Sequence, residues 1–240
     1  MIKLTDEISP EFVAACADSA FGCKILATAL AYGFNAKIAL YWLSDTAFCL
    51  WGENMTIAGD ILDPCETAAF LRVLSPKTVL CSKANANLLH LPVLEEGEIL
   101  CKVQQSFLPK EIASCFSTEA RGIFSLLQKH HMIESFQSFY LDFSHKLRHG
   151  VGCLHTEKEF GVMVSCALST YITQDSAIIT AVATMPGQEN RGLGTKAVLE
   201  CEKLLAGRKI YVLKEKNKNN SFYQNLNYHF AQDWCSCKVF

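Results

Sequence analysis

The sequence predicts an α/β (α+β) fold in two domains, and three observations support this. Half of the 240 residues are hydrophobic, which is enough for the buried cores of one large or two modest domains. Short apolar runs with strand patterns alternate with longer runs of helical spacing. Both halves repeat one order of elements: a hairpin, a third strand, a helix, a strand and a short helix. We therefore expect an N-terminal α/β domain at residues 1–97 and a second domain at residues 98–240.

In the first half, two helices precede a small sheet. The segments 12–17 and 21–32 have apolar residues at helical spacing, and three short strands separated by polar turns follow them. Asp63 and Pro64 are typical of a helix start, with the aspartate as cap and the proline in the first turn. The expected strands are Lys37–Leu43, Ala47–Trp51, Met55–Ala58 and Lys77–Cys81, and the later helices are Asp63–Leu74 and Lys83–Leu89.

The second half starts near Glu98 with an apolar strand, and two helices and a hairpin follow it. Thr156–Glu159 is the expected hairpin turn, and Gly207 is a stop signal for a later helix. The expected helices are Arg121–His130, Ser135–Leu147, Gly192–Leu205 and Asn219–Leu226. The expected strands are Ile99–Val103, Val151–His155, Phe160–Leu168, Ser176–Met185, Lys209–Leu213 and Trp234–Phe240.

Composition and charge argue against several classes of partner. The chain has 22 basic and 24 acidic residues, so it offers no strongly basic surface for nucleic acid or an anionic membrane. The first residues lack the basic segment and apolar stretch of a secretory signal. The apolar stretch from Phe21 to Phe34 is shorter than the roughly 20 residues that span a bilayer. We expect a cytoplasmic protein that binds neither nucleic acid nor membrane.

The cysteines and histidines do not predict a metal site. Twelve cysteines are spread mostly singly through apolar runs, as is typical of buried free thiols in a reducing compartment. Cys235 and Cys237 would share one face of a strand, but zinc needs two more ligands at matching spacing. His145 and His149 are four residues apart and could share a helix face. A third ligand is not evident, and solvated or capping histidines explain the pair as well.

A polar loop rich in glycine follows the third strand of the second half. Pro186 and Gly187 open it, and two further glycines lie where the next helix begins. A helix start presents unpaired N–H groups and the positive end of the helix dipole, and glycine lets an anion approach the backbone. Arg191 adds a cation. The matching junction in the first half, residues 59–64, has one glycine and two acids, so we expect an anion site in the second half only.

Glycines at a helix start also occur in dinucleotide-binding folds. Residues 192–197 match the pattern G-x-G-x-x-G/A, and Glu215 lies 18 residues after Ala197. That fold places its first glycine directly at the end of the strand, whereas six residues, 186–191, intervene here. Only 25 residues follow Glu215, too few for the remaining strand–helix units. The dinucleotide interpretation is therefore rejected.

The same region resembles the GNAT superfamily of acyl-CoA N-acyltransferases. Its members show a strand, a loop with proline, a segment like R-G-x-G-x-G at a helix start, and then a strand and a helix carrying F-Y-x-x-x-G-F. The corresponding segments here are Val182–Pro186, Arg191–Thr195 and Phe222–Tyr228. Gly192 and Tyr223 are 31 residues apart, which suits one helix, one strand and a helix start. The order of elements also matches the superfamily, so the resemblance covers about residues 98–240.

The sequence departs from the family pattern at three positions. Glu189 stands where members usually have arginine or glutamine, Asn190 replaces a common glycine, and Asn227 replaces the glycine before the last aromatic residue. Asparagine tolerates left-handed backbone. The family's pyrophosphate contacts come largely from loop amides. Glu189 therefore argues against a contact from its own side chain more than against the pyrophosphate site.

The resemblance implies a mixed, centrally splayed sheet flanked by helices, and it suggests that residues 1–97 are a degenerate GNAT-like copy or a cover for the acceptor side. In this superfamily the pantetheine arm of CoA pairs with the exposed edge of the third strand, where Val182 and Thr184 are expected. A backbone N–H there stabilises the oxyanion, and Tyr223 would protonate the departing thiolate. The implied cofactor-binding residues are Val182, Ala183, Thr184, Glu189, Asn190, Arg191, Gly192, Leu193, Gly194, Thr195, Asn219 and Phe222.

The implied function is transfer of an acetyl group from acetyl-CoA to a primary amine of a small molecule or peptide, by direct attack with Tyr223 as general acid. The amine must be neutral to attack, and Asp142, His145 and His149 are expected on the acceptor side, but none is singled out as the base. A non-catalytic acyl-CoA-binding or sensing protein and a purely structural domain are the alternatives. No motif specifies the acceptor, the acyl-chain length or the oligomeric state.

Overall fold

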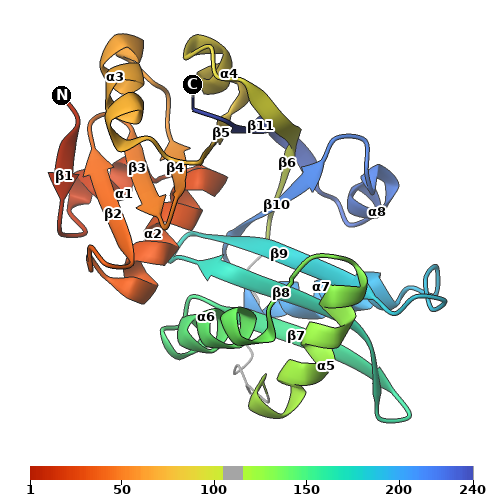
Figure 1. Ribbon diagram of the computed structural model, residues 1–240. Coiled ribbons are helices and arrows are strands. Elements are labelled where there is room, and N and C mark those ends of the chain that lie inside the picture. Colours follow the sequence, from red (N-terminus) through yellow and green to blue (C-terminus); the bar gives the residue numbers. More distant parts are fainter. Residues whose placement is uncertain (105–115, 240) are drawn as a thin grey trace. The chain divides into compact units, whose positions relative to one another are not determined.

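The computed structural model describes residues 1–104 and 116–239 (Figure 1). The chain divides into two compact units. The first combines Met1–Leu100 with Leu213–Asn220 and His229–Phe240, and the second combines Cys101–Val212 with Ser221–Tyr228. Within the described residues, no helix is both long enough and apolar enough to cross a membrane.

The first unit contains a mixed sheet in the order β1-β2-β3-β4-β5-β11-β6. Strands β1 to β4 are antiparallel neighbours, β4 and β5 are parallel, and β11 is antiparallel to β5. The strands are β1 (Lys3–Thr5), β2 (Ala39–Leu43), β3 (Ala47–Trp51), β4 (Asn54–Ala58), β5 (Thr78–Ser82), β6 (Val93–Val103) and β11 (His229–Cys237). The helices are α1 (Pro10–Ala15), α2 (Ala20–Tyr32), α3 (Pro64–Leu74) and α4 (Lys83–Leu88).

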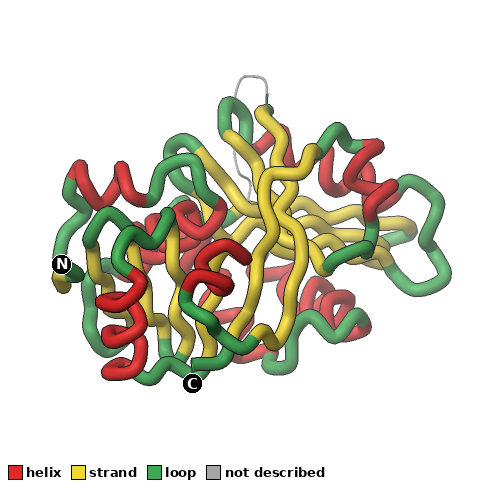
Figure 2. Tube along the Cα trace, turned by 90° about the horizontal axis from the view of Figure 1, so that it is seen from above, coloured by secondary structure: helices red, strands yellow, loops and turns green. Residues whose placement is uncertain are grey.

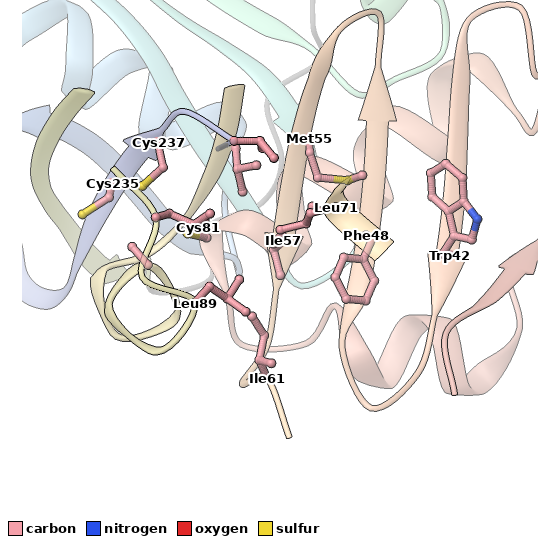
Figure 3. Packing of buried hydrophobic residues seen from close by; sticks show 14 residues of the cluster. Trp42, Phe48, Met55, Ile57, Ile61, Leu71, Cys81, Leu89, Cys235 and Cys237 are labelled. Carbon is pink, nitrogen blue, oxygen red and sulfur yellow. The ribbon is translucent and has the colours of Figure 1, made fainter. Parts of the chain in front are cut away.

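Helices cover both faces of this sheet. Tyr41 of β2 meets Phe12 of α1 with ring centroids 6.0 Å apart, whereas its neighbour Trp42 meets Phe70 of α3 at 5.2 Å. Because successive side chains of a strand point to opposite faces, α1 and α3 lie on opposite sides of the sheet. The face that α3 covers holds a cluster of buried apolar side chains from β2 to β5 and β11 (Figure 3).

The cysteines are packed as the sequence predicts. All of those that the structure describes are free thiols. Cys235 lies opposite Cys81 in the β5–β11 ladder, and both belong to the buried cluster with Cys237 (Figure 3). Cys23, Cys49, Cys81, Cys166 and Cys201, which lie singly inside apolar runs, are buried, and Cys101 is half-buried. The described residues include no group of three or more side chains that could hold a metal ion.

The second unit contains four strands in the order β10-β9-β8-β7. The first three in the chain are antiparallel neighbours, and β10 runs parallel to β9. The strands are β7 (Cys153–Glu159), β8 (Val162–Ile172), β9 (Ser176–Thr184) and β10 (Lys209–Glu215), and the helices are α5 (Phe116–Lys129), α6 (Phe136–Arg148), α7 (Leu193–Leu204) and α8 (Asn220–Asn225). Helices α5 and α6 bury a cluster rich in aromatic rings against β8 and β9.

The predicted α/β fold with a mixed sheet and flanking helices is confirmed, but several bounds were wrong. Strand β1 was not expected, β6 begins at Val93, and α5 begins at Phe116 instead of Arg121. Residues 117–119 are therefore inside the helix and do not precede it. Strand β11 begins at His229, five residues before the expected start.

The hairpin turn of the second unit lies at Phe160 and Gly161, not at residues 156–159. Both residues have positive φ, 50° and 78°, as two-residue hairpin turns of the mirror-image type require. The polar residues 156–159 stay extended because helices on both faces of β7 supply partners for them. Thr156 and Lys158 bond to Glu119 of α5, while Glu157 bonds to Lys196 of α7.

Both units show the repeated order of elements. In each, an antiparallel trio of strands leads into a helix and then into a strand that is parallel to the third member of the trio: β4-α3-β5 in one unit and β9-α7-β10 in the other. A second, N-terminal GNAT-like arrangement is consistent with this order. The domain boundary between residues 97 and 98, which falls inside β6, stays a prediction.

Candidate functional site

Strand β9 leaves its neighbour β10 halfway along its length. The pairing with β10 covers only Ser176 to Ile179, whereas the pairing with β8 continues to Thr184. The β8–β9 register skips Thr180, which marks a bulge where the contact with β10 ends. Among the described residues, 180–184 have no partner strand on the β10 side. This is the splayed edge that the sequence predicts.

The register shows which backbone groups line this edge. The N–H of Met185 bonds to the carbonyl of Val164 at 2.8 Å, so hydrogen-bonded pairs alternate from there back along β9. Ala183 therefore directs its backbone groups toward β8, where its carbonyl also accepts from the Ser165 hydroxyl at 2.9 Å. The N–H and C=O groups of Val182 and Thr184 point to the open side.

One of these edge groups is engaged by a histidine. Nε2 of His130 lies 2.7 Å from the carbonyl oxygen of Thr184. His130 directly follows α5, and 54 residues of chain separate the two partners. Sequence reasoning missed this residue, because no motif or spacing links a histidine at a helix end to a strand so distant in the chain.

The start of α7 differs from five other helix starts. Gly192 is its N-cap with φ of 76°, a left-handed conformation that favours glycine, and no side chain caps the helix. Five other helices are capped by a side chain that accepts from a first-turn N–H: Ser9, Ser19, Asp63, Ser82 and Ser135. Within the described part of the chain, the N–H groups of residues 191–195 have no hydrogen-bond partner. The site thus keeps its backbone donors open.

Glycine at position 194 brings three elements together. A Cβ there would lie 3.1 Å from Oγ1 of Thr184 and 3.7 Å from the ring of Phe222. The end of β9, the first turn of α7 and helix α8 therefore meet at Gly194. The segments Val182–Thr184, Arg191–Thr195 and Phe222-Tyr223, which the sequence motifs single out, adjoin one another here.

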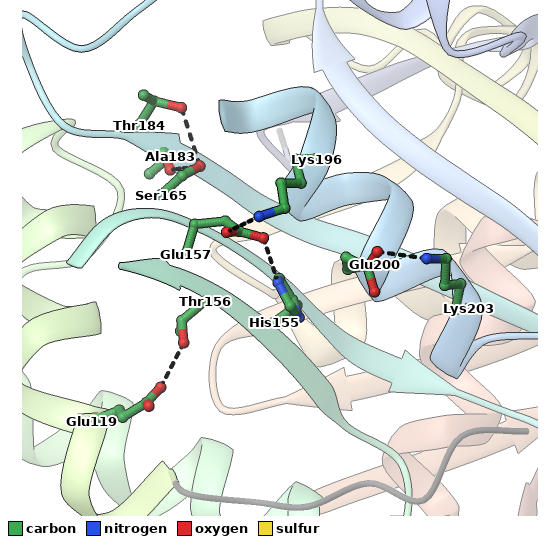
Figure 4. Close-up of polar contacts among 10 residues, drawn as sticks. All are labelled: Glu119, His155, Thr156, Glu157, Ser165, Ala183, Thr184, Lys196, Glu200 and Lys203. Atoms are coloured by element: carbon green, nitrogen blue, oxygen red, sulfur yellow. Dashed lines mark hydrogen bonds and ion pairs between the residues drawn. The ribbon is translucent and has the colours of Figure 1, made fainter. Parts of the chain in front are cut away.

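The cations beside the loop are paired with carboxylates of β7. Arg191 makes a two-pronged contact with Glu159 at 2.9 and 3.1 Å and also bonds to Gln188. Lys196 bonds at 2.7 Å to Glu157, whose second oxygen bonds to His155 (Figure 4). Burial opposes ionisation of Glu157, but the bonds from Lys196 and His155 outweigh it and hold its pKa below the ordinary value.

Glu189 contributes a negative charge to the same loop. Its carboxylate accepts a hydrogen bond from the N–H of Gly187 at 2.7 Å. Asn190, the next residue, has φ of 61°, so it adopts the left-handed conformation in which the family usually has glycine. The loop therefore keeps the required backbone shape despite both departures from the family pattern.

Tyr223 lies in α8 and is largely buried. The rings of Phe222 and Tyr228 meet it edge-on with centroids at 5.0 and 5.7 Å. Burial raises the pKa of Tyr223 to about 12. No hydrogen bond joins its hydroxyl to another of the described residues. Asn219 stands just before α8 with φ of 55° and belongs to the first compact unit.

A buried carboxylate ties α8 to α7. Glu202 accepts from the hydroxyl of Tyr228 at 2.9 Å and from Lys102 at 2.6 Å. Burial, followed by the nearby Glu202 carboxylate, raises the pKa of Tyr228, so this hydroxyl remains a donor. The last aromatic residue of the F-Y-x-x-x-N-Y segment thus anchors the helix that carries Tyr223.

The residues expected on the acceptor side are partly engaged with one another. Asp142 forms an ion pair with the buried Lys146 at 3.1 Å, and the rings of His145 and His149 are tilted by 37° with centroids 4.3 Å apart. Burial lowers the pKa of Lys146, although the Asp142 carboxylate opposes this. These contacts account for Asp142 and for the histidine pair without a metal ion.

Comparison with known proteins agrees with this geometry. Residues 115–228 match the model of the Acetyltransferase (GNAT) family. A GCN5-related N-acetyltransferase from Kribbella flavida superposes with a TM-score of 0.64 at 13% identity, over 89% of this chain and 92% of that chain. A GCN5-related N-acetyltransferase from Sphaerobacter thermophilus gives 0.58 at 9% identity, over 98% and 94%. A tandem GNAT protein from the clavulanic acid biosynthesis pathway gives 0.52 at 11% identity, over 98% and 97%.

No curated protein matches the chain in sequence. At such low identities the likeness to solved structures concerns the fold alone. The fold is that of the GCN5-related N-acetyltransferases named above. The family match then makes the assignment specific: residues 115–228 form a domain of the GNAT acetyltransferase family, which supports an acyltransferase activity.

Proposed function

We propose that the protein is an N-acetyltransferase that transfers the acetyl group of acetyl-CoA to a primary amine of a small molecule or a peptide. The observation that carries the proposal is the uncapped start of α7, where the N–H groups of residues 191–195 have no partner within the described residues. Such a turn suits a diphosphate, since its amides and the helix dipole both favour negative charge. The adjoining open edge of β9 suits the pantetheine arm.

The chemistry follows from this placement. The backbone N–H of Val182 points to the open side of β9 and is suited to hold the thioester oxygen as negative charge develops on it. The amine nitrogen attacks the carbonyl carbon, the carbon–sulfur bond breaks, and the thiolate leaves. Tyr223 directly follows Phe222, whose ring adjoins Gly194, and we assign its hydroxyl as the donor to the departing sulfur.

The raised pKa of Tyr223 affects how it acts. A pKa of about 12 keeps the hydroxyl protonated throughout the neutral range, so the donor is always present. It also makes the tyrosine a weaker acid than a thiol, whose ordinary pKa is about 8.5. We therefore expect the hydroxyl to stabilise the thiolate first by a hydrogen bond, with the proton finally supplied through exchange with solvent.

A Tyr223→Phe variant tests this role. We expect its kcat to fall about 10- to 100-fold, because a hydrogen bond to the leaving group is lost, while the affinity for CoA changes less than about two-fold. Release of free thiol from acetyl-CoA across a panel of amines measures kcat, and calorimetry measures binding. Unchanged kcat in the variant would refute the role of Tyr223.

The alternative is a protein that binds acyl-CoA without turnover. One observation favours this alternative. None of the side chains of β9 is titratable, so the strand itself supplies no acid or base for turnover. The same thiol-release assay separates the two functions. Binding of CoA without thiol release with any amine in the panel would favour the sensor.

A further inference from the structure

The position of His130 is set by the packing of α5. The helix places Ile123, Leu126 and Leu127 in the buried cluster against β8 and β9. The N–H of His130 bonds to the carbonyl of Leu127 at 3.1 Å, so the residue continues the last turn. The packing of α5 therefore positions the ring of His130 against the Thr184 carbonyl.

The contact determines which ring nitrogen is free. A carbonyl oxygen only accepts hydrogen bonds, so Nε2 of His130 carries the hydrogen in the 2.7 Å contact with Thr184. In the neutral ring, Nδ1 then holds a lone pair and can take up a proton. The Thr184 carbonyl is the hydrogen-bond partner of this ring within the described residues, and the residue is exposed. Nδ1 is thus open to an acceptor amine and to solvent.

The ring lies within working distance of the expected reaction. Thr184 and Val182 are two residues apart along the strand, which corresponds to about 7 Å. The N–H of Val182 is the proposed donor to the thioester oxygen, and the attacking amine must lie next to that carbonyl group. A base on the Thr184 side reaches the amine directly or through one water molecule.

The elements packed against α5 carry titratable groups of their own, of which Lys158 of β7 pairs with Glu119 of α5. Strand β9 has no titratable side chain. On α6, Asp142 pairs with Lys146 and the rings of His145 and His149 adjoin each other. On β8, burial raises the pKa of the Cys166 thiol to about 12, and Tyr171 lies under Lys146. Lys129, His131 and Glu134 neighbour His130 in the chain.

We propose that His130 is the general base of the acyl transfer. The inference rests on the proposed function. As the amine nitrogen bonds to the thioester carbon, its proton passes to Nδ1 of His130 and then to solvent. The carbon–sulfur bond breaks and the sulfur receives a proton in turn, so the products are an amide and a free thiol. The Thr184 carbonyl orients the ring.

The test is the pH dependence of kcat/KM for the amine in the full-length protein. A general base acts in its neutral form, so we expect the wild-type kcat/KM to rise with pH and this rising limb to depend on His130. In His130→Gln the amide still donates to Thr184 but accepts no proton. We expect kcat/KM to fall about 100-fold, the rising limb to vanish, and CoA affinity to stay within about two-fold.

Two further variants complete the test. His131→Asn is the matched control, because His131 is the exposed neighbour with φ of 56°, which asparagine tolerates. We expect it to retain the wild-type profile. Added imidazole should restore activity to His130→Ala in a concentration-dependent way, whereas a structural role would not respond.

The outcomes separate this inference from the proposed function. A wild-type protein that releases thiol, with His130→Gln keeping the rising limb and a rate within three-fold, overturns the base role alone. The same profile together with tighter CoA binding would mean that the ring only blocks the edge of β9. If the wild-type protein binds CoA but releases no thiol with any amine, acyl transfer itself is refuted, and the base role with it.

Discussion

Glu189 is the residue whose charge opposes the proposed ligand. Its carboxylate bonds to the N–H of Gly187 within the loop that we expect to hold a diphosphate. The neighbouring cation does not offset this charge, because Arg191 is paired with Glu159 and Gln188. At this position the local charge and the proposed function are in conflict, which makes the residue informative.

A Glu189→Gln variant should therefore bind CoA more tightly. Removal of one exposed negative charge beside a diphosphate is worth roughly 1 kcal/mol, which corresponds to an affinity gain of about three- to ten-fold. Calorimetry at two salt concentrations measures it, and the gain should shrink at the higher one. Glu200→Gln, further along α7 where Glu200 pairs with Lys203, is the control. Weaker binding by Glu189→Gln would show instead that the carboxylate shapes the loop.

At the scale of elements, the start of α7 and the end of β9 act as one unit. Gly194 permits a close approach between them, since the nearest side-chain atom to a Cβ would be Oγ1 of Thr184 at 3.1 Å. That hydroxyl also lies 3.2 Å from the hydroxyl of Ser165 on β8. A side chain at position 194 would therefore disturb the strand edge as well as the helix start.

Gly194→Ala should weaken CoA binding about ten-fold while changing the melting temperature by only a few degrees. The added methyl crowds Thr184, but alanine also favours the helix by about 1 kcal/mol over glycine, so the two effects on stability largely cancel. Calorimetry and thermal unfolding measure the two quantities. Gly122→Ala in α5 is the matched control, because its Cβ would have the flexible end of Met163 as its nearest neighbour, at 3.3 Å. Equal CoA affinity in both variants would contradict this account of the site.

The sequence predicted most elements because their local signals are strong. Asp63 and Pro64 define the start of α3, and the glycines at 192 and 194 define the start of α7. The predicted turn at residues 156–159 was wrong because polar residues usually indicate a turn. Here they belong to a strand and bond to side chains of α5 and α7. His130 was missed for a related reason, since its contact with Thr184 exists only after the chain has folded.

At the scale of the whole molecule, the two units share one order of elements but differ at the start of the helix that follows the third strand. The helix that follows the third strand starts at Asp63 in the first unit and at Gly192 in the second. The Asp63 carboxylate accepts from the N–H of Glu66 at 2.9 Å, and Asn85 accepts from the N–H of Ile61 at 3.3 Å. Two of the donors that could hold an anion at this junction are thus already engaged.

We therefore expect one CoA molecule to bind per chain. Calorimetric titration of the full-length protein gives this ratio directly, with the active fraction of the sample fixed by an independent protein assay. A ratio of two would mean that the start of α3 can exchange its own carboxylate for a phosphate, which contradicts the assigned difference between the units.

The sequence did not predict which segments of the chain make up each unit. Strand β11, at the end of the chain, pairs with β5, so that Trp234 lies opposite Ser82. Local patterns identify a strand but not its partner, and antiparallel pairing over such a distance depends on the packing of the whole unit. The repeated order of elements could be predicted, because each helix or strand has a local pattern that does not depend on its partner.

The central claim is that the N–H groups of residues 191–195 hold the diphosphate of the cofactor. Amide-resolved NMR of ¹⁵N-labelled protein during titration with CoA tests it most directly, with dephosphorylated pantetheine, which lacks the diphosphate, as the matched ligand. We predict that the largest shifts on addition of CoA fall on residues 191–195, and that pantetheine shifts Val182 and Thr184 but leaves 191–195 in place. Unchanged resonances of residues 191–195 at saturating CoA would contradict the account.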